Sequence, residues 1–252
     1  MTTSVDAVIV HWFGGRQLVR CVRSCLASGA FASVIVVDNG GLDSRGEVAG
    51  PGVRIIPMAS NVGYGRAANA GLAACTADAA LVLNQDVEVS ADGVALLLAA
   101  AIEAGAWVAG PCLVDDAGRA AEPKDRFPAP LSWPAPPGAR GAAGARPVPW
   151  VAGAAMLFGP GHLDLRFDPR LFMYVEDEEL CWRVWVAGGS VVWVPGATFA
   201  HHGGTASGRR WSLPAITRRT VVNRARMVRW HSGRRGLVPF AADVLRRRLR
   251  RR

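Results

Sequence analysis

The amino-acid sequence predicts an α/β protein built on a mostly parallel, doubly wound sheet. Short runs rich in Val, Ile and Leu alternate along residues 7–109 with stretches of helical character, which is typical of strand–helix–strand units. With 252 residues, of which 50% are hydrophobic, the chain can build one large domain with a full core. Polar residues follow three of the strand-like runs, where open parallel sheets bind ligands.

The predicted strands and helices follow one another in chain order. The β-rich runs AVIV, SVIVV, VRIIPM, AALVL and WVA predict strands at residues 7–10, 33–37, 53–58, 79–83 and 107–109. The longer stretches between them predict helices at residues 17–27, 65–75 and 91–104. Helical crossovers of this kind join parallel strands, so we expect helices on the faces of the sheet.

Residues 171–183, LFMYVEDEELCWR, place four consecutive acids behind an aromatic and methionine run: Glu176, Asp177, Glu178 and Glu179. Leu180 and Val184 continue at helical spacing, so the acids are expected in the first turn of a helix with one buried face. Acids in a first turn complement the helix dipole, and that role alone would explain them. The alternative is a set of functional carboxylates. Arg183 is expected to pair with Glu179 one turn earlier.

The net charge of +9 is unevenly distributed. Residues 209–252 hold 15 of the 29 basic residues and one acid, Asp243, which leaves residues 1–208 with 14 basic and 19 acidic residues, a balance of −5. A mildly negative body argues against a nucleic-acid-binding protein, despite the high overall pI. The basic, amphipathic stretch 213–230 and the arginine-rich stretch 244–252 suit an anionic membrane surface or an acidic acceptor, although a solvated terminus is the alternative.

Cysteine usage and the N-terminus indicate a cytoplasmic protein. The five cysteines show no paired CxxC arrangement and lie mostly in apolar stretches, so we expect reduced core residues. The first residues, MTTSVDAVIVHW, lack the features of a signal peptide. The longest apolar stretch, residues 94–114, contains a charge, glycines and a proline and is expected to form a core helix and a strand instead of a membrane span.

Polar clusters at the predicted strand ends indicate a nucleotide site. His11 and Trp12 follow the first strand, residues 38–40 (Asp-Asn-Gly) follow the second, and residues 84–86 (Asn-Gln-Asp) follow the fourth. Parallel strands bring their carboxyl ends to one edge of a sheet, where nucleotides bind.

Residues 60–69, SNVGYGRAAN, form a glycine-bearing turn into a helix. Gly63 and Gly65 permit close backbone approach, and the helix start offers free N–H groups to phosphate or ribose oxygens. An ordinary loop would also explain the pattern. The segment is not a P-loop, and the first strand-to-helix turn, HWFGGRQ, lacks the dinucleotide-binding glycines.

Asp86 ends the predicted strand AALVL and is a candidate ligand for a divalent cation. Carboxylate oxygens suit Mg²⁺ or Mn²⁺ held against a diphosphate, while capping of the next element is the alternative. His201 and His202 supply a candidate nitrogen ligand if the fold brings one of them to Asp86.

Two further segments carry weaker signals. The small residues of 150–156, WVAGAAM, would let a substrate lie against the backbone, or the segment is a buried strand. Residues 123–149 contain eight prolines and little periodic apolar content, so we expect a flexible loop over the site or a surface insertion.

Taken together, these motifs resemble family 2 glycosyltransferases of GT-A fold, most closely the bacterial rhamnosyltransferase branch. The segments that carry the resemblance occur in the family's order and cover roughly residues 5–210: VIVVDNGG (34–41), SNVGYGRAANAG (60–71), LVLNQDV (81–87), WVAGAAMLF (150–158), FDPRLFMYVEDEELCWR (167–183) and AHHGGTASG (200–208). The resemblance implies a Rossmann-like, mostly parallel sheet with flanking helices over residues 1–210, followed by a basic helical extension over residues 211–252.

The resemblance also implies a donor site and a metal site. Asp38 would contact the nucleotide base, and Asp86 would be the last aspartate of the DxD motif, whose first position is Asn84 here. His201 matches the family's metal-ligand histidine better than His202. The nucleoside and diphosphate would be lined by Asn39, Asn61, Gly63, Gly65, Asn69 and Asn84.

The implied reaction is an inverting transfer that depends on a divalent cation, Mg²⁺ or Mn²⁺. Asp177 would be the general base that deprotonates the acceptor hydroxyl, and Glu176 would orient the acceptor. The cation would stabilise the departing nucleoside diphosphate. One carboxylate base suffices because no covalent glycosyl-enzyme forms.

The favoured substrates are a nucleotide-diphosphate sugar donor, dTDP-L-rhamnose, and a glycan or polyprenyl-diphosphate-linked acceptor in cell-envelope polysaccharide synthesis. A UDP- or GDP-sugar donor with the same fold and mechanism is the first alternative. A basic nucleic-acid-binding protein and an inactive sugar-binding relative are less favoured. The expected location is cytoplasmic, peripheral on the inner face of the membrane and attached there through the basic C-terminus.

Overall fold

A computed structural model describes residues 3–13, 15–41, 45–123, 125–133, 144–203 and 211–249. Its strands form one sheet in the order β3-β2-β1-β4-β9-β6-β10-β5, with β7 beside β6 and β8 beside β10. The strands are β1 (Val5–His11), β2 (Ser33–Asp38), β3 (Val53–Pro57), β4 (Ala79–Asn84), β5 (Val87–Glu88), β6 (Val108–Val114), β7 (Ala120–Ala121), β8 (Arg146–Pro147), β9 (Ala155–Phe158) and β10 (Val191–His201).

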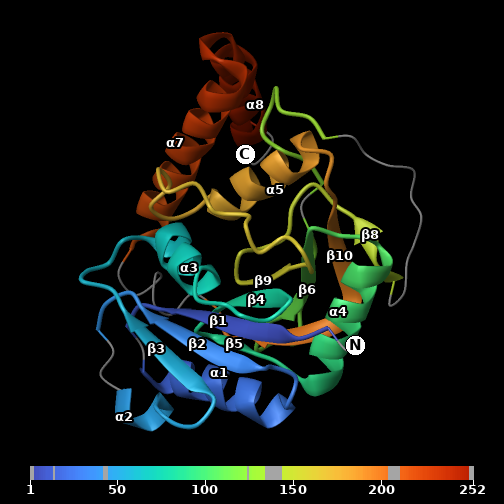
Figure 1. The fold of residues 1–252 in the computed structure, drawn as a ribbon. Helices are drawn as coiled ribbons and strands as arrows, with labels where there is room; N and C mark the ends of the chain where they lie inside the picture. The colour runs from blue at the N-terminus through green and yellow to red at the C-terminus, as the bar shows by residue number, and fades with distance from the viewer. Residues whose placement is uncertain are drawn as a thin grey trace.

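Helices cover both faces of this sheet (Figure 1). Helices α1 and α4 pack on one face, α3 and α5 lie over the other, and α7 and α8 lie beyond α5. The helical elements are α1 (Gly15–Ser28), α2 (Arg45–Val48), α3 (Tyr64–Leu72), α4 (Ala91–Glu103), α5 (Glu176–Val186), α7 (Leu213–Ser232), the 3-10 turn η2 (Arg234–Gly236) and α8 (Leu237–Leu249).

The core follows from the two-residue periodicity of the central strands. Along β1, Ala7 and Ile9 belong to the apolar cluster under α1 and α4, whereas Val8 and Val10 belong to the cluster under α3 and α5. All seven residues of β1 are buried, which is why the strand is a continuous apolar run apart from Asp6 and His11.

The predicted strands and helices are confirmed within a few residues, and the predicted first-turn acids do begin a helix, α5. The parallel arrangement holds for β3, β2, β1 and β4, and for β6 with β10. The sequence did not predict that β9 enters antiparallel between β4 and β6. Only the last two residues of segment 150–156 lie in this buried strand.

Some sequence predictions fall partly outside the described residues. Residues 124 and 134–143 of the proline-rich segment are among these, so a loop over the site is not tested there, while β8 forms at its end. The same holds for residues 204–208 of the motif at 200–208, and for residues 209, 210 and 250–252 of the basic tail. Within the described parts, no helix is both long and apolar enough to cross a membrane. The five cysteines are free thiols.

Candidate active site

The polar clusters predicted at the strand ends do converge on one edge of the sheet. His11 lies opposite Asp38 in the β1–β2 ladder, and Val10 lies opposite Asn84 in the β1–β4 ladder. Buried Gln85 ties two of these strand ends together, since its side chain accepts a hydrogen bond from the Trp12 N–H at 2.7 Å and donates one to the Phe13 carbonyl. This cross-link fixes the edge on which the site is built.

Asn39 organises the loop that precedes α3. The side chain is 2% exposed, its Oδ1 accepts from the Val62 N–H at 2.9 Å, and its Nδ2 donates to Asn61 Oδ1 at 3.0 Å. Asn61 Oδ1 in turn accepts from the Gly63 N–H at 2.9 Å. The two amides therefore fix the backbone of this loop through hydrogen bonds. Asp38 accepts a hydrogen bond from the Gly40 N–H at 3.1 Å.

The other predicted donor-site residues, Gly63 directly before α3 and Gly65 and Asn69 on it, pack against residues 167–172. Gly63 has φ of +90° and lies so close to Phe172 that an added Cβ would come within 2.2 Å of its carbonyl oxygen. An added Cβ on Gly65 would come within 2.8 Å of the Phe167 Cβ. Asn69 hydrogen-bonds to both the N–H and the carbonyl of Phe167, each at 2.9 Å. These three residues hold the segment that leads into α5.

Asp86 and His201, which are far apart in the sequence, lie side by side. Antiparallel pairing of β10 with β5 places His201 opposite Val87, and the His201 Nε2 lies 3.5 Å from Asp86 Oδ1. Asp86 is 8% exposed, and its Oδ1 has no hydrogen-bond partner among the described residues. An unsatisfied buried carboxylate oxygen facing an imidazole nitrogen fits a divalent cation. The described residues contain no group of three potential metal-ligating side chains.

His202 has a different environment, as its two ring nitrogens are occupied by carboxylates. Nδ1 lies 2.5 Å from Asp116 Oδ1, and Nε2 lies 2.7 Å from Glu88 Oε1. Arg20 contacts the same Glu88 oxygen at 2.5 Å. The geometry therefore favours His201 over His202 as the metal-ligand candidate.

The start of α5 is preceded by a strained turn. Tyr174 and Val175 are non-glycine residues with φ of +70° and +78°, and left-handed backbone costs about 1–2 kcal/mol for each such residue. Asn223 of α7 stabilises the turn, because its buried Nδ2 donates to the carbonyls of Met173 and Tyr174, both at 2.9 Å. A residue of the C-terminal helix thus fixes the direction in which α5 begins.

The four acids at this start divide into two pairs with different surroundings. Glu179 is fully buried and contacts Arg183 at 2.9 Å, as predicted, and also His231 at 3.0 Å. Glu178 contacts Arg224 of α7 at 2.9 Å. These two carboxylates join α5 to its own last turn and to α7.

Asp177 and Glu176 face a cavity, which Glu178 also lines, and neither forms an ion pair with an arginine or a histidine among the described residues. Asp177 Oδ2 accepts from the Gly153 N–H at 2.9 Å and Oδ1 from the Glu178 N–H at 2.8 Å, whereas Glu176 Oε2 is buried without a hydrogen-bond partner among the described residues. Burial raises the pKa of both carboxyls, and the neighbouring Asp177 helps to raise the pKa of Glu176 to about 8. Because more backbone N–H groups favour the anion at Asp177 than at Glu176, and Arg224 favours it too, Asp177 is the member of the pair that ionises first.

The cavity has a volume of 320 Å³ and joins the carboxylates to the sheet edge. Asn84 lies in its wall, two residues before Asp86. We call it the reaction cavity. It is lined by Tyr64, Asn84, Trp150, Ala152, Gly153, Ala154, Met173, Tyr174, Val175, Glu176, Asp177, Glu178, Thr220 and Arg224.

Sequence reasoning did not select Tyr64 or Arg224 as site residues. Tyr64 lies within the recognised 60–69 segment, and its hydroxyl donates to the Gly153 carbonyl at 2.5 Å. Burial and the two acids raise its pKa well above the usual value, so the phenol keeps its proton. Arg224 belongs to the basic tail, where local sequence gives no sign that one arginine points inward.

Comparison with known proteins identifies the family. Residues 7–147 match the glycosyl transferase family 2 domain. The chain belongs to this family. This family 2 glycosyltransferase is 31% identical over 243 residues to the N-acetylglucosaminyl-diphospho-decaprenol L-rhamnosyltransferase of Mycobacterium tuberculosis, a match that covers 83% of the chain and 79% of that protein. The same match is found in two strains of that organism.

Solved structures support the GT-A fold. The chain superposes on GalNAc-T7, solved with UDP, GalNAc and Mn²⁺, with a TM-score of 0.68 and 17% identity over 90% of its own length. It spans 47% of that chain. It also superposes on S. aureus TarS 1-349 in complex with UDP-GlcNAc, with a TM-score of 0.61 and 13% identity, covering 90% of this chain and 66% of TarS 1-349. The protein is therefore a glycosyltransferase of GT-A fold, as its motifs predict.

The buried Glu176 predicts a pH dependence of stability. Its pKa lies near 8 in the folded protein against an ordinary value of 4.5, so between these values the folded state holds a proton that the unfolded chain releases. The free energy of unfolding should therefore fall as pH rises from 4.5 to 8. In the wild type, the ionisation of Glu176 should lower the free energy of unfolding between pH 5 and pH 8 by an amount on the order of a few kcal/mol. Glu176→Gln should lack this contribution. Denaturant unfolding at the two pH values measures the difference.

Glu103→Gln is the matched control, because Glu103 is an exposed glutamate at the end of α4. It should unfold with the same pH dependence as the wild type. Equal pH dependence in the wild type and in Glu176→Gln would show that Glu176 ionises normally in the folded protein.

Proposed function

We propose that this glycosyltransferase transfers a sugar, with inversion, from a nucleoside diphosphate to a hydroxyl of a lipid-linked or other glycan acceptor. The observation that carries the proposal is the position of Asp177. It lies at the start of α5 in the reaction cavity, together with Asn84 of the sheet edge. A direct displacement requires the base and the bound donor to lie close to the same acceptor hydroxyl. A base and a donor-binding edge that share one cavity would meet this requirement.

In the proposed reaction Asp177 accepts the proton of the acceptor hydroxyl as that oxygen attacks the anomeric carbon. A carboxylate has about four lone-pair positions, so Asp177 can receive this proton while it keeps the bonds from Gly153 and Glu178. Protonated Glu176 adds a hydrogen-bond donor that orients the acceptor, and its neutrality avoids a second negative charge beside the base.

The donor would lie along the sheet edge. We propose that Asp38 contacts the base and that the nucleoside and diphosphate follow the backbone of the loop shaped by Asn39 and Asn61. Gly63 and Gly65 bring that loop close to the segment leading to α5. The described bonds of Asn39, Asn61 and Asn69 are made to backbone or to each other, which supports a role in shaping the donor site through the backbone.

Asp86 and His201 would hold a divalent cation, Mg²⁺ or Mn²⁺. The unsatisfied Asp86 Oδ1 and the nearby imidazole nitrogen support this assignment, and Asn84 retains a side-chain oxygen at the first DxD position. When bound, such a cation neutralises charge on the departing diphosphate. Only two protein ligands come together among the described residues, which leaves room for diphosphate oxygens and water.

The favoured donor is dTDP-L-rhamnose, and the favoured acceptor is an N-acetylglucosamine linked to a polyprenyl diphosphate. The support is the name of the mycobacterial relative, an N-acetylglucosaminyl-diphospho-decaprenol L-rhamnosyltransferase. A UDP-sugar is the alternative, since the more distant TarS structure holds UDP-GlcNAc. Cell-envelope polysaccharide synthesis would be the setting.

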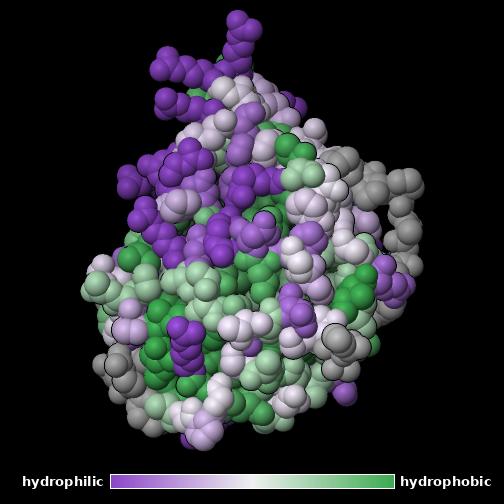
Figure 2. Space-filling model, viewed as in Figure 1, coloured by the Kyte–Doolittle hydropathy of each residue, from purple (hydrophilic) through white to green (hydrophobic). Residues whose placement is uncertain are grey.

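We further propose that the 211–252 extension places the enzyme on the inner face of the membrane. Exposed apolar residues of α8 recur at helical spacing: Val238, Leu245 and Leu249, with 75%, 59% and 64% exposure. Hydrophilic side chains gather over α7 and α8 in Figure 2, where the tail carries its arginines. An apolar stripe flanked by arginines suits an anionic bilayer surface.

Donor binding tests the nucleotide assignment first. Calorimetry with Mg²⁺ or Mn²⁺ should show tighter binding of dTDP-rhamnose than of UDP-glucose, UDP-galactose or GDP-mannose. His201→Ala should weaken metal-dependent donor binding by about 10- to 100-fold. The control is His162→Ala, which should leave donor binding unchanged, because His162 stacks on Trp107. Tighter binding of a UDP- or GDP-sugar would overturn only the assignment of dTDP-rhamnose as the donor. No binding at all would argue against the enzyme mechanism.

Asp177→Asn tests the base. Transfer should fall by about 10²- to 10⁴-fold, because the amide cannot accept the proton, while the dissociation constant for the donor stays unchanged. Single-turnover transfer and calorimetry measure the two quantities. A variant that keeps wild-type transfer would show that Asp177 is not the base.

Membrane attachment is tested by flotation with phosphatidylcholine vesicles with and without phosphatidylglycerol. Binding should require the anionic lipid and weaken in high salt. Val238→Glu with Leu245→Glu should abolish it, whereas Ile102→Glu, at an exposed apolar position on α4, should not. Equal flotation of all three proteins would contradict attachment through α8.

A further inference from the structure

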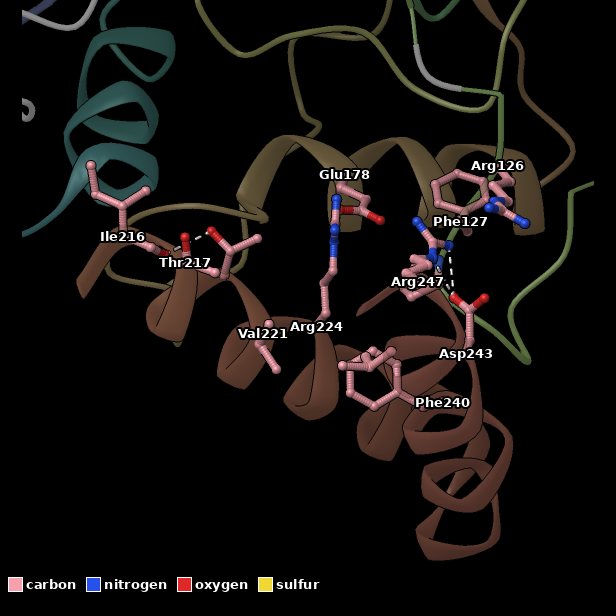
Figure 3. Close-up of a pocket in the computed structure, with 13 residues that line it drawn as sticks. Arg126, Phe127, Glu178, Ile216, Thr217, Val221, Arg224, Phe240, Asp243 and Arg247 are labelled. Atoms are coloured by element: carbon pink, nitrogen blue, oxygen red, sulfur yellow. Dashed lines mark hydrogen bonds and ion pairs between the residues drawn. The ribbon is translucent and has the colours of Figure 1, made fainter. Parts of the chain in front are cut away.

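A second cavity lies between α7, α8 and residues 126–128 (Figure 3). It adjoins the reaction cavity. Its volume is 290 Å³, near the lower end of the range for small-molecule sites. Three side chains line both cavities: Glu178, Thr220 and Arg224. The two cavities therefore meet at the contact between α5 and α7. We call the second one the α7–α8 cavity.

The walls of the α7–α8 cavity are largely apolar. Helix α7 contributes Ile216 and Val221, and α8 contributes Phe240 and Val244. Phe127 closes the opposite side and is 2% exposed. Such a lining favours a hydrocarbon group over a sugar.

Arginines add positive charge to this apolar space. Arg224 uses its Nε to contact Glu178 at 2.9 Å, and Arg247 contacts Asp243 through Nε at 2.8 Å and through a terminal nitrogen at 2.7 Å. A guanidinium has five N–H donors, so these bonds leave donors for an anion. Arg126 is a third arginine in the lining, which contains two carboxyl groups, those of Glu178 and Asp243.

The electrostatic balance favours an anion further. Burial raises the pKa of Glu178 to about 7 despite the opposing effect of Arg224, so at neutral pH this carboxyl carries a proton for part of the time. Asp243 stays ionised, since Arg247 lowers its pKa. Within the lining, three guanidinium groups then face fewer than two full negative charges, although Arg126 also lies 4.0 Å from the exposed carboxylate of Asp125 outside it. Paired guanidinium groups bind phosphate well.

Helix α8 presents two different faces. Phe240, Val244 and Arg247 recur at spacings of four and three residues and line the cavity, whereas Val238 and Leu245 belong to the exposed stripe. The cavity and the exposed stripe therefore lie on opposite sides of α8, and a chain leaving the cavity would pass around this helix to reach the bilayer.

From this arrangement we infer that the α7–α8 cavity binds the diphosphate and first isoprene unit of a polyprenyl-diphosphate-linked acceptor, with Arg224 and Arg247 contacting the phosphates. The inference rests on the proposed function, because it takes the acceptor's sugar to lie in the reaction cavity beside Asp177. The diphosphate is one sugar ring away from the attacking hydroxyl, and the shared wall at Arg224 lies between the two cavities. The remainder of the prenyl chain would continue into the membrane.

Two acceptors that differ only in the diphosphate test the inference: farnesyl-diphosphate-linked N-acetylglucosamine and the farnesyl glycoside of the same sugar. Arg247→Gln should raise the KM for the diphosphate acceptor about tenfold and leave the KM for the glycoside unchanged, because a charge-assisted hydrogen bond to phosphate is lost. For Arg247→Lys, the KM for the diphosphate acceptor should lie between the values of the wild type and Arg247→Gln. The matched control is Arg246→Gln, the exposed neighbour on α8, which should behave as wild type.

The outcomes separate this inference from the proposed function. Transfer by the wild type to both acceptors, with the same KM values in Arg247→Gln, would overturn the α7–α8 site alone. Failure of the wild type to bind the donor or to use either acceptor would overturn both. If Arg247→Gln instead reduced flotation with anionic vesicles and left both KM values unchanged, the cavity would bind lipid headgroups and the inference would be wrong.

Discussion

The start of α5 is the constraint on which the rest of the site depends. Two consecutive left-handed residues, Tyr174 and Val175, turn the chain so that the first carboxylates of the helix face the reaction cavity. Strain of this kind persists only where the surroundings enforce it. Here the buried amide of Asn223 holds the turn from α7, and the Gly153 N–H holds Asp177 from the sheet side. The base is thus positioned between two distant parts of the chain.

This constraint gives the C-terminal helices a structural role beyond their charge. Arg224 and His231 form ion pairs with carboxylates that are almost fully buried, Glu178 and Glu179. A buried carboxylate without such partners would be strongly destabilising. The four first-turn acids are therefore not equivalent. Two anchor the helix, and Asp177 accepts two backbone hydrogen bonds from other residues. Glu176 has one oxygen without a hydrogen-bond partner among the described residues and keeps its proton. The division between body and extension at residue 210 remains a proposal.

Much of the site could be predicted because local sequence carries it. The strand-end clusters were found from β-rich runs that stop at polar residues, and parallel pairing then brings Asp38 and Asn84 to one edge. The pairing of Arg183 with Glu179 followed from helical spacing alone. The roles of Asn39 and Asn69 could not be read in this way, because an asparagine that binds a nucleotide and one that binds backbone look alike in sequence. Their described bonds are to neighbouring loops.

The sequence by itself determined the fold class, the strands that end in polar residues, and the helix that carries the acids. Periodicity and turn residues are local properties, so they can be recognised without the tertiary structure. Only the tertiary structure decided which residues meet. The β5–β10 pairing brings His201 to Asp86, and the packing of α7 on α5 selects Arg224 from 15 basic residues of the tail. These contacts join residues dozens of positions apart or more, and their energy comes from burial and pairing that no local pattern encodes.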